Sequence, residues 1–363
     1  MSLRELVLIN FRNYEYEKIP FFEGCHVFYG PNAQGKTNLL ESVYITARGQ
    51  SFKTTTDRKL IRFGERSAYI RSRVCEAERE KEVEIKFSMV DRKRVRINQV
   101  ELESAAALAE QFDVVLFAPE NLELVQGAPS ERRAYMDSIL LGTDPAYRSL
   151  LRSYEKTVFQ RNQLLKTQGA WFLEQLKSYD QQLASAAVAL VKKRQALADV
   201  LQRETVPLHY ALSGKTEQCA MAYRTNCPTE EQDVLEALEE TRKRDLEMRN
   251  TEIGPHRDEL ELTINALPAR LFASQGQART LTLACKLAEL KLREQKHGHR
   301  PLLLLDDVFS ELDDKRAYIL LELIRPFQSL VTTNEATFLQ QEQKDAHFYR
   351  VESGKITLQA RSN

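Results

Sequence analysis

The sequence lacks the features that mark membrane, secreted and zinc-binding proteins. Its 363 residues include only five cysteines, which are scattered and never spaced as CxxC, so neither a disulfide framework nor a zinc cluster is expected. The longest leucine run, residues 302–305, is far shorter than the roughly 20 apolar residues that span a bilayer. Arg4 and Glu5 fall where a secretory signal would be apolar. We therefore expect a cytoplasmic protein without a membrane segment.

Net charge is also absent, because 52 basic and 52 acidic residues cancel. The charges are nevertheless unevenly distributed, since residues 48–96 contain 15 Lys or Arg against 8 Asp or Glu. Two interpretations of this segment stay open. It is either a sheet face whose arginines pair with Glu78, Glu80, Glu82 and Glu84, or a phosphate-binding surface. On the second interpretation, the predicted DNA-binding residues are Arg71, Arg73, Arg94 and Arg96.

Periodicity divides the chain into an α/β part interrupted by a helical part. Residues 1–120 and 250–363 both show strand and helix patterns in alternation, and we expect them to form one discontinuous α/β domain. Residues 121–249 show helical spacing, and within them residues 144–205 have the pattern of an antiparallel coiled-coil hairpin. Pro207 is expected to end this hairpin. Residues 329–331 are expected to form the last strand.

A glycine-rich loop between a predicted strand and a predicted helix carries the strongest chemical signal. It fits the pattern GxxxxGK[ST], in which backbone N–H groups surround phosphate oxygens at the start of a helix. Lys36 would reach the terminal phosphates, and the hydroxyl of Thr37 would bind Mg²⁺. The sequence thus predicts an ATP and Mg²⁺ site formed by Gly30, Pro31, Asn32, Ala33, Gln34, Gly35, Lys36 and Thr37.

Two aspartates follow the run of four leucines. A strand of this composition is buried on both faces, so Asp306 lies at its carboxyl end, where open α/β sheets bind ligands. Asp306 is therefore predicted to hold the metal together with Thr37. Asp307 is predicted to orient or deprotonate the attacking water.

The segment Ser274-Gln275-Gly276-Gln277 precedes an apolar helix. Serine and glycine before a helix are ordinary capping residues. The segment nevertheless lies between the loop lysine and the acidic strand, which is the place of the signature loop in ABC-type ATPases, where one protomer closes on the γ-phosphate bound by another. Residues 310–313 similarly stand at the place of the D-loop of that class. Ser274 and Gln277 thus join Lys36 and Asp307 as candidate catalytic residues.

Three further segments extend the match over the whole chain. Residues 10–14 read NFRNY, residues 119–122 read PENL with Arg132, Arg133 and Asp137 after them, and residues 254–258 read GPHRD. With these motifs the chain resembles the RecF family, DNA replication and repair ATPases of the SMC branch. It departs from the family at Asn121 and Gln126, where an acid and a lysine are usual.

The resemblance implies a fold and a function. The fold would be an ABC-type P-loop ATPase head with a mixed sheet and an inserted helical lobe. The function would be that of a recombination mediator with weak, DNA-stimulated ATPase activity. ATP would drive a homodimer that binds single-stranded, duplex or gapped DNA, and slow hydrolysis would reset it. With RecO and RecR it would help to load RecA in repair, replication and SOS induction.

The resemblance also implies roles for residues. The loop from Gly30 to Thr37 would bind the nucleotide, Asp306 the metal and Asp307 the water, whereas Ser274 and Gln277 would contact the γ-phosphate of the opposite protomer. Asp307 is one methylene shorter than the glutamate usual in ABC transporters. Slow turnover, suited to a switch and not to a motor, would follow.

Other classes share the order of these motifs. A nucleotide-binding subunit of an ABC transporter normally has a shorter insertion and no coiled-coil hairpin. An SMC-like chromosome protein needs hundreds of coiled-coil residues, more than the segment 144–205 supplies. A DNA clamp without ATPase activity would result if Asp307 were inert.

Two smaller features have more than one interpretation. Trp171, next to the predicted hairpin turn, either stacks on DNA or closes the turn by packing. Within the GPHRD segment, Arg257 and Asp258 are expected to pair with each other, and a structural turn is favoured over a catalytic role of His256.

Overall fold

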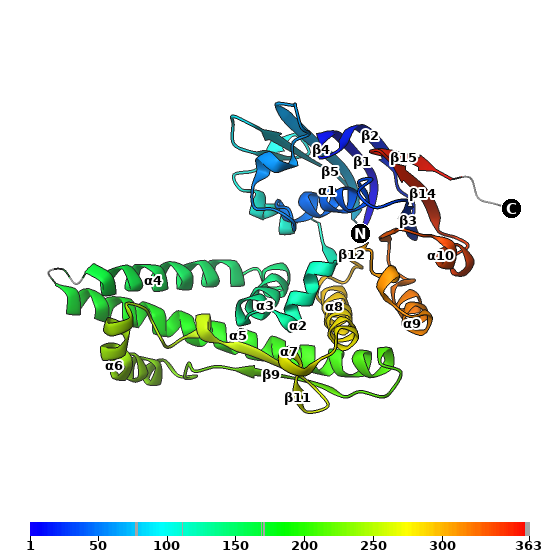
Figure 1. Cartoon of the computed structure of the whole chain (residues 1–363). Coiled ribbons are helices and arrows are strands. Elements are labelled where there is room, and N and C mark those ends of the chain that lie inside the picture. Colours follow the sequence, from blue (N-terminus) through cyan, green and yellow to red (C-terminus); the bar gives the residue numbers. More distant parts are fainter. Residues whose placement is uncertain (77–78, 111, 168, 170, 360–363) are drawn as a thin grey trace. The chain divides into compact units, whose positions relative to one another are not determined.

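The computed structural model describes residues 1–359 apart from 77, 78, 111, 168 and 170 (Figure 1). Its contacts divide the chain into two compact units. Unit 1 contains Met1–Asn121 and the residues from Leu290 onward, and unit 2 contains Leu122–Glu289. None of the helices in the described ranges is long and apolar enough to cross a membrane.

Unit 1 contains two six-stranded sheets. Sheet A is antiparallel with the order β2-β1-β4-β5-β6-β7, and sheet B has the order β15-β14-β3-β13-β12-β8, in which only β15 runs antiparallel to its neighbour. The strands of sheet A are β1 (Ser2–Phe11), β2 (Tyr14–Pro20), β4 (Ser67–Glu76), β5 (Arg79–Ser88), β6 (Arg94–Ile97) and β7 (Val100–Glu101). Those of sheet B are β3 (Cys25–Tyr29), β8 (Val114–Phe117), β12 (Leu302–Asp306), β13 (Ser329–Thr333), β14 (His347–Glu352) and β15 (Lys355–Leu358).

Helix α1 (Lys36–Arg48) contacts strands of both sheets in unit 1. Its side chains Leu39 and Val43 are fully buried in one cluster with Ile70 of sheet A and Leu304 of sheet B. Burying one such side chain stabilises the fold by roughly 1.5–3 kcal/mol. Because α1 is fixed in this core, the loop before it is held at the carboxyl ends of β3, β12 and β13.

The remaining helices that lie wholly in unit 1 follow strands of sheet B. They are α9 (Asp314–Ile324) and α10 (Thr337–Glu342), with the 3-10 turns η1 (Asp57–Leu60), η2 (Ala105–Glu110) and η5 (Phe309–Glu311) elsewhere in the unit. The prediction that residues 329–331 form the last strand is wrong, because β14 and β15 come after it. The first two residues of β14 are half-buried, and its last four alternate between buried and exposed. The strand therefore lacks the continuous apolar run by which a buried strand is predicted.

Unit 2 consists of helices and a three-stranded sheet with the order β11-β10-β9. Helices α4 and α5 pack against each other as the predicted hairpin. The elements are α2 (Glu123–Gln126), α3 (Pro129–Thr143), α4 (Tyr147–Thr167), α5 (Phe172–Leu212), β9 (Cys219–Arg224), α6 (Glu231–Met248), η4 (Pro255–Arg257), β10 (Glu259–Ile264), β11 (Leu267–Pro268), α7 (Ala269–Phe272) and α8 (Gln275–His297). The turn η3 (Pro119–Leu122) precedes them.

Helix α5 is longer than the sequence predicts, because Pro207 lies inside it and does not end it. A proline inside a helix removes one backbone hydrogen bond and costs about 3 kcal/mol. Here Leu208 and Leu212 after the proline are buried, and α5 packs along β9. The apolar burial of this last turn and a half offsets the proline.

The boundary between the units also differs from the predicted one. The sequence predicts residues 250–289 in the α/β domain, but their contacts place them in unit 2. The reason is that β10 pairs along its whole length with β9, from Glu259 opposite Arg224 to Ile264 opposite Cys219. Helix α8 begins in unit 2 and continues into unit 1 at Leu290.

Candidate nucleotide-binding site

The predicted phosphate loop joins the end of β3 to the start of α1. Gly30 and Gly35 have φ angles of 149° and 116°, values that side chains other than glycine rarely allow. A Cβ atom on Gly30 would collide with the carbonyl oxygen of Val351, and one on Gly35 would collide with the side chain of Asn13. The two glycines are therefore required by close packing of the loop against β14 and against the β1–β2 turn.

The NFRNY segment holds this loop from the side of sheet A. Asn13 Nδ2 donates to Gln34 O at 2.8 Å, and the buried Tyr14 hydroxyl donates to Gly35 O at 2.9 Å. Asn38 Nδ2 of α1 donates to Asn13 Oδ1 at 2.9 Å. The opening motif of the chain is thus a support for the backbone of the phosphate loop.

Lys36 is folded over the loop that precedes it. Its Nζ donates to Gly30 O at 2.5 Å, to Pro31 O at 2.8 Å and to Asn334 Oδ1 at 3.0 Å. Burial lowers the pKa of the Lys36 ammonium, although the carboxylates of Asp307 and Asp306 act in the opposite direction. Sequence reasoning misses Asn334. Its position directly after β13, at the same sheet edge as Asp306, is the signal that could have identified it.

Asp306 ends β12 beside α1. Its Oδ1 accepts hydrogen bonds from Thr37 Oγ1 at 2.8 Å and Thr332 Oγ1 at 2.7 Å. Burial raises the pKa of the Asp306 carboxyl despite these bonds. A carboxylate and a hydroxyl oxygen side by side fit Mg²⁺, which prefers oxygen ligands. The charge of a divalent cation would also offset the burial of the carboxylate.

Asp307 has the left-handed backbone conformation, with φ of 55°. Its amide N–H donates to Thr332 Oγ1 at 3.0 Å, and its carboxylate accepts a hydrogen bond from Ser310 Oγ at 2.5 Å. A non-glycine residue in this conformation is held there by its surroundings and often marks a functional site. Ser310 belongs to the predicted D-loop, so this segment directly contacts the proposed water-activating group.

Ser274 and Gln277 form a capping box at the start of α8. Gln277 N donates to Ser274 Oγ at 3.2 Å, and Ser274 N donates to Gln277 Oε1 at 2.9 Å. Gln277 Nε2 also donates to Glu217 Oε1 at 2.9 Å. Ser274 is exposed. These two residues belong to unit 2, whereas the loop, Asp306 and Asp307 belong to unit 1.

The arginines predicted to bind DNA differ in their surroundings. Arg71 lies 3.2 Å from Glu5 and 3.9 Å from Glu82, and Arg73 lies 3.3 Å from Glu82. Arg96 lies 3.9 Å from Glu101. Within the described part of the chain, no ion pair is seen for Arg94. Arg71 and Arg73 thus fit the interpretation of an ion-paired sheet face, although the carboxylates involved include Glu5 of β1. Glu78 lies outside the described residues.

The GPHRD segment has a structural role in unit 2, and its expected Arg257–Asp258 pair is not found among the described residues. Arg257 pairs instead with Glu252 at 2.9 Å, because Asp258 is turned inward, where it accepts a hydrogen bond from the Tyr223 hydroxyl. His256 Nδ1 lies 2.6 Å from the Tyr154 hydroxyl of α4. Burial lowers the pKa of His256, so the segment attaches the hairpin through a neutral imidazole.

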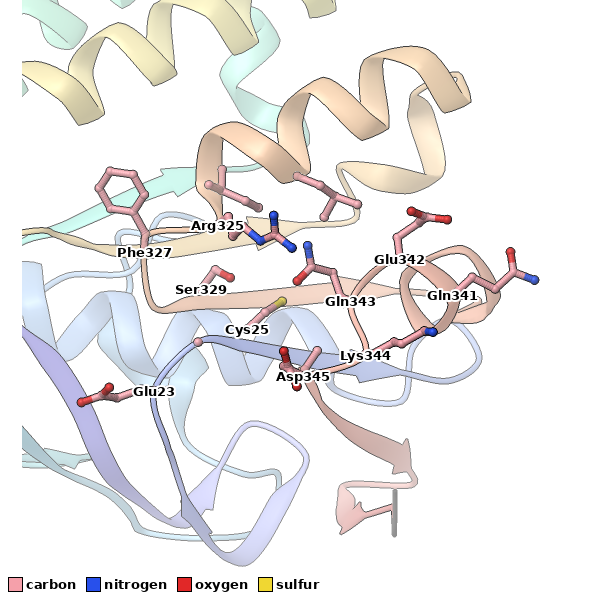
Figure 2. Close-up of a pocket in the computed structure, with 14 residues that line it drawn as sticks. Glu23, Cys25, Arg325, Phe327, Ser329, Gln341, Glu342, Gln343, Lys344 and Asp345 are labelled. Atoms are coloured by element: carbon pink, nitrogen blue, oxygen red, sulfur yellow. The ribbon is translucent and has the colours of Figure 1, made fainter. Parts of the chain in front are cut away.

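A hollow of about 550 Å³ lies at the opposite edge of sheet B (Figure 2). Cys25 and Ser329, the first residues of β3 and β13, line it together with Arg325, and Figure 2 shows all three. Burial raises the pKa of the Cys25 thiol to about 11. The thiol is therefore protonated near neutral pH, and this hollow offers no thiolate for chemistry.

Known proteins are similar to this chain over nearly its whole length. Residues 2–357 match the family described as RecF/RecN/SMC N terminal domain. The DNA replication and repair protein RecF of Geobacillus kaustophilus (strain HTA426) is 37% identical, with 98% of this chain and 99% of that protein covered. The RecF of Alkaliphilus oremlandii (strain OhILAs) is 35% identical over 98% of this chain and 100% of its own length. The chain belongs to the RecF family.

Solved structures agree with this assignment. The recombination mediator protein RecF-ATP in the RecFOR pathway has a TM-score of 0.89 at 32% identity, covering 99% of this chain and 97% of that one. An SmcHead bound to the C-winged helix domain of ScpA has a TM-score of 0.62 at 15% identity, covering 99% of this chain and 98% of that one, and shows a shared fold. The predicted RecF resemblance and the ABC-type ATPase head with an inserted helical lobe are confirmed.

Proposed function

We propose that this RecF family chain is an ATP-dependent switch of DNA recombination and repair. The observation that carries the proposal is the meeting of Lys36, Thr37 and Asp306 at one edge of sheet B. Two buried charges of opposite sign at the start of a helix suit a nucleotide phosphate with its metal. The relatives named for DNA replication and repair, and the solved structure of a RecF with ATP, support the same interpretation.

The residues of unit 1 have distinct roles in this proposal. The backbone N–H groups of the loop and Lys36 bind the phosphates, and Thr37 with Asp306 holds Mg²⁺. When bound, Mg²⁺ neutralises charge that develops on the phosphates. Asp307 takes a proton from the attacking water or orients it, and Ser310 fixes the direction of its carboxylate. Thr332 fixes both aspartates, because it donates to Asp306 and accepts from the Asp307 amide.

The site is completed by a second copy of the chain. Ser274 is exposed at the start of α8, the position from which a helix N-terminus and a hydroxyl contact phosphate. On this proposal, ATP joins two chains, the joined pair binds DNA, and hydrolysis separates it. Partners of the type of RecO and RecR then act with the DNA-bound form to load RecA on gapped DNA.

Sedimentation and DNA binding, each with and without ATP and Mg²⁺, test the proposal. The wild-type chain is expected to become a dimer and to bind DNA only with ATP. Lys36→Ala should lose both effects because the phosphates lose their cation. Ser274→Arg should bind ATP and stay monomeric. Ser274→Ala is the milder comparison: it removes the hydroxyl, worth about 1 kcal/mol of helix stability as a cap, without adding bulk, and should weaken ATP-driven dimerisation less than Ser274→Arg does. If Ser274→Arg still dimerises with ATP, the shared site is wrong.

A further inference from the structure

One end of sheet A carries an exposed aromatic side chain. Phe63 is fully exposed at 102% of its reference area, and Val90 is exposed at 88%. The two residues lie in neighbouring loops, residues 61–66 and 89–93, because Met89 N donates to Arg66 O at 3.0 Å and Ser67 pairs with Ser88. Apolar side chains this exposed contribute nothing to the core, which makes them candidates for contact with another molecule.

Cations surround this end of the sheet, which we call the Phe63 edge. Arg66, Lys86, Arg92 and Arg94 are all exposed. No ion pair involving these four is found among the residues that the structure describes. The acids near them are Glu65, Asp91 and Asp57. Asp91 lies 3.4 Å from the Ser88 hydroxyl, and Asp57 pairs with Lys93 at 3.1 Å. A hollow of about 520 Å³ beside the second loop is lined by further charged residues, including Arg58 and Lys93.

Positive charge without a neutralising carboxylate is therefore concentrated at one end of sheet A. The arginines nearer the other end, Arg71, Arg73 and Arg96, are neutralised by Glu5, Glu82 and Glu101. In the sheet register, Lys86 lies opposite Arg94, so two cations face each other at the Phe63 edge. Like charges in such a cross-strand pair destabilise the sheet. An anionic partner would relieve this repulsion.

We propose that the Phe63 edge binds DNA where bases are unpaired, with Phe63 stacked on a base and Arg66, Arg92 and Arg94 on the phosphates. An aromatic face among cations suits a single strand, because every base offers a stacking surface beside a charged backbone. A neutral lipid or an apolar protein surface would explain the apolar side chains but not the unneutralised arginines around them. This inference rests on the proposed function, since it names the surface that contacts DNA.

The Phe63 edge is linked to the phosphate loop by short hydrogen bonds. Arg62 N donates to Asn10 O at 2.8 Å, and Arg12 Nη1 donates to Lys59 O at 3.0 Å. Asn13, the next residue, donates to Gln34 of the phosphate loop. A nucleotide that orders the phosphate loop would thereby order the β1–β2 turn and the loop that carries Phe63.

The stacking is tested with the full-length chain in ATP and Mg²⁺, by fluorescence anisotropy on two labelled probes. One probe is a blunt duplex, and the other is the same duplex with a single-stranded overhang. The wild-type chain is expected to prefer the overhang. Phe63→Ala should weaken binding to the overhang by roughly 5- to 100-fold, the usual effect of removing one stacked base, and should change blunt-duplex binding little. Phe63→Trp should retain the preference.

Trp171→Ala is the matched control, because Trp171 is an exposed aromatic residue of unit 2. It should leave both affinities unchanged. An overhang preference that survives Phe63→Ala, or that disappears in Trp171→Ala, overturns the assignment to Phe63. In that case ATP-dependent DNA binding still stands. A wild-type chain that binds neither probe with ATP contradicts the proposed function itself.

The charges are tested with Arg66→Glu combined with Arg92→Glu. Affinity for both probes should fall, and the dependence of log affinity on log salt should flatten by roughly 0.7 to 0.9 for each phosphate that the protein no longer binds. Arg325→Glu combined with Lys344→Glu is the control. These exposed cations line the hollow beside the first residues of β3 and β13 in sheet B, and the proposal gives them no part in DNA binding. Equal salt dependence in both double variants would overturn the assignment of the phosphate-binding arginines.

Discussion

Two buried charges at the phosphate loop are perturbed in opposite directions by the same cause. Burial lowers the pKa of Lys36 and raises that of Asp306. In the protein without ligand, burial thus disfavours the charged form of each of these two side chains. A phosphate near Lys36 and a metal near Asp306 would each favour that charged form. The site is built for a ligand at some expense of stability, as functional sites often are.

Asp306→Asn is expected to stabilise the ligand-free protein and to abolish Mg²⁺-dependent ATP binding. The carboxamide oxygen still accepts from Thr37 and Thr332, while the buried charge is removed. Since the pKa of Asp306 is raised on folding, its ionised form destabilises the protein above the usual pKa of an aspartate. The variant should therefore melt at a higher temperature than the wild type near neutral pH.

The pH dependence of that difference provides the control. As the pH falls through the range in which Asp306 takes up a proton, the two melting temperatures should converge, because both side chains are then neutral. Thermal melts of both proteins across this range, with isothermal titration of ATP and Mg²⁺ at neutral pH, measure the two effects. A lower melting temperature of the variant at neutral pH would contradict the claim that the buried charge of Asp306 destabilises the fold.

At the residue scale, the sequence predicts those site residues whose motif lies within one short stretch of the chain. The loop residues and Asp306 follow from a motif between a strand and a helix, and from two acids after four leucines. Val351 follows from no local pattern, because pairing of β14 with β3 brings it to the loop; Asn334 had only its place at the end of a predicted strand as a signal, and pairing of β13 with β3 brings it there. The partners of Arg71 also required the register, which sets β1 beside β4 and so brings Glu5 near.

At the scale of elements, one buried arginine ties the hairpin to its neighbours. Arg161 of α4 is fully buried, with Nε 2.7 Å from Asp180 of α5 and Nη1 2.7 Å from Asp245 of α6. It also donates to the Thr251 hydroxyl at 2.9 Å. Burial raises the pKa of Asp245, although Arg161 opposes this shift. The three helices thus meet at a single guanidinium group.

Arg161→Met is expected to destabilise unit 2 by about 3–5 kcal/mol, because the buried Asp245 loses Arg161 and the buried Asp180 keeps only Arg242, at 3.8 Å. Urea unfolding followed by circular dichroism, a signal to which the long helices of unit 2 contribute most, measures the destabilisation. The control is Arg325→Met, which removes an exposed pair with Glu322 at 3.4 Å and should cost at most about 1 kcal/mol. Similar small effects in both variants would show that other groups compensate for the buried charges of Asp180 and Asp245 when Arg161 is absent.

The elements that the sequence did not predict are short strands and helix ends. Strand β9 is only six residues long, and its partner β10 is more than 30 residues away in the chain, so pairing decides its conformation. Pro207 shows the reverse case, in which a strong local signal is overridden by burial of Leu208 and Leu212. Long amphipathic helices such as α4 needed no such tertiary information, because their period is continuous.

At the scale of the whole molecule, the proposed switch needs a hydrolytic group that acts slowly and only in the joined pair. Helix α8 starts next to Ser274 and continues into unit 1, where Arg293 pairs with Asp113 at 3.0 Å. Asp307 contacts Ser310 of the D-loop segment, and Asp313 of that segment caps α9. On the proposed function, the group that activates water would therefore be attached to a segment that faces a second copy.

Asp307→Asn is expected to separate ATP-driven dimerisation from release. The carboxamide keeps the size of the carboxylate and can still accept from Ser310, but it cannot take a proton from water. Hydrolysis should fall by roughly 10²- to 10⁴-fold, the usual contribution of a general base, while ATP still joins two chains. The variant should stay on DNA after free ATP is removed, under conditions in which the wild type dissociates.

Lys36→Ala is the control for this prediction, because it should not be retained on DNA under any of these conditions. The measurements are phosphate release and the lifetime of the DNA complex after dilution into buffer without ATP. Wild-type turnover in Asp307→Asn would remove Asp307 from its role, and a short lifetime despite abolished turnover would show that hydrolysis does not control release.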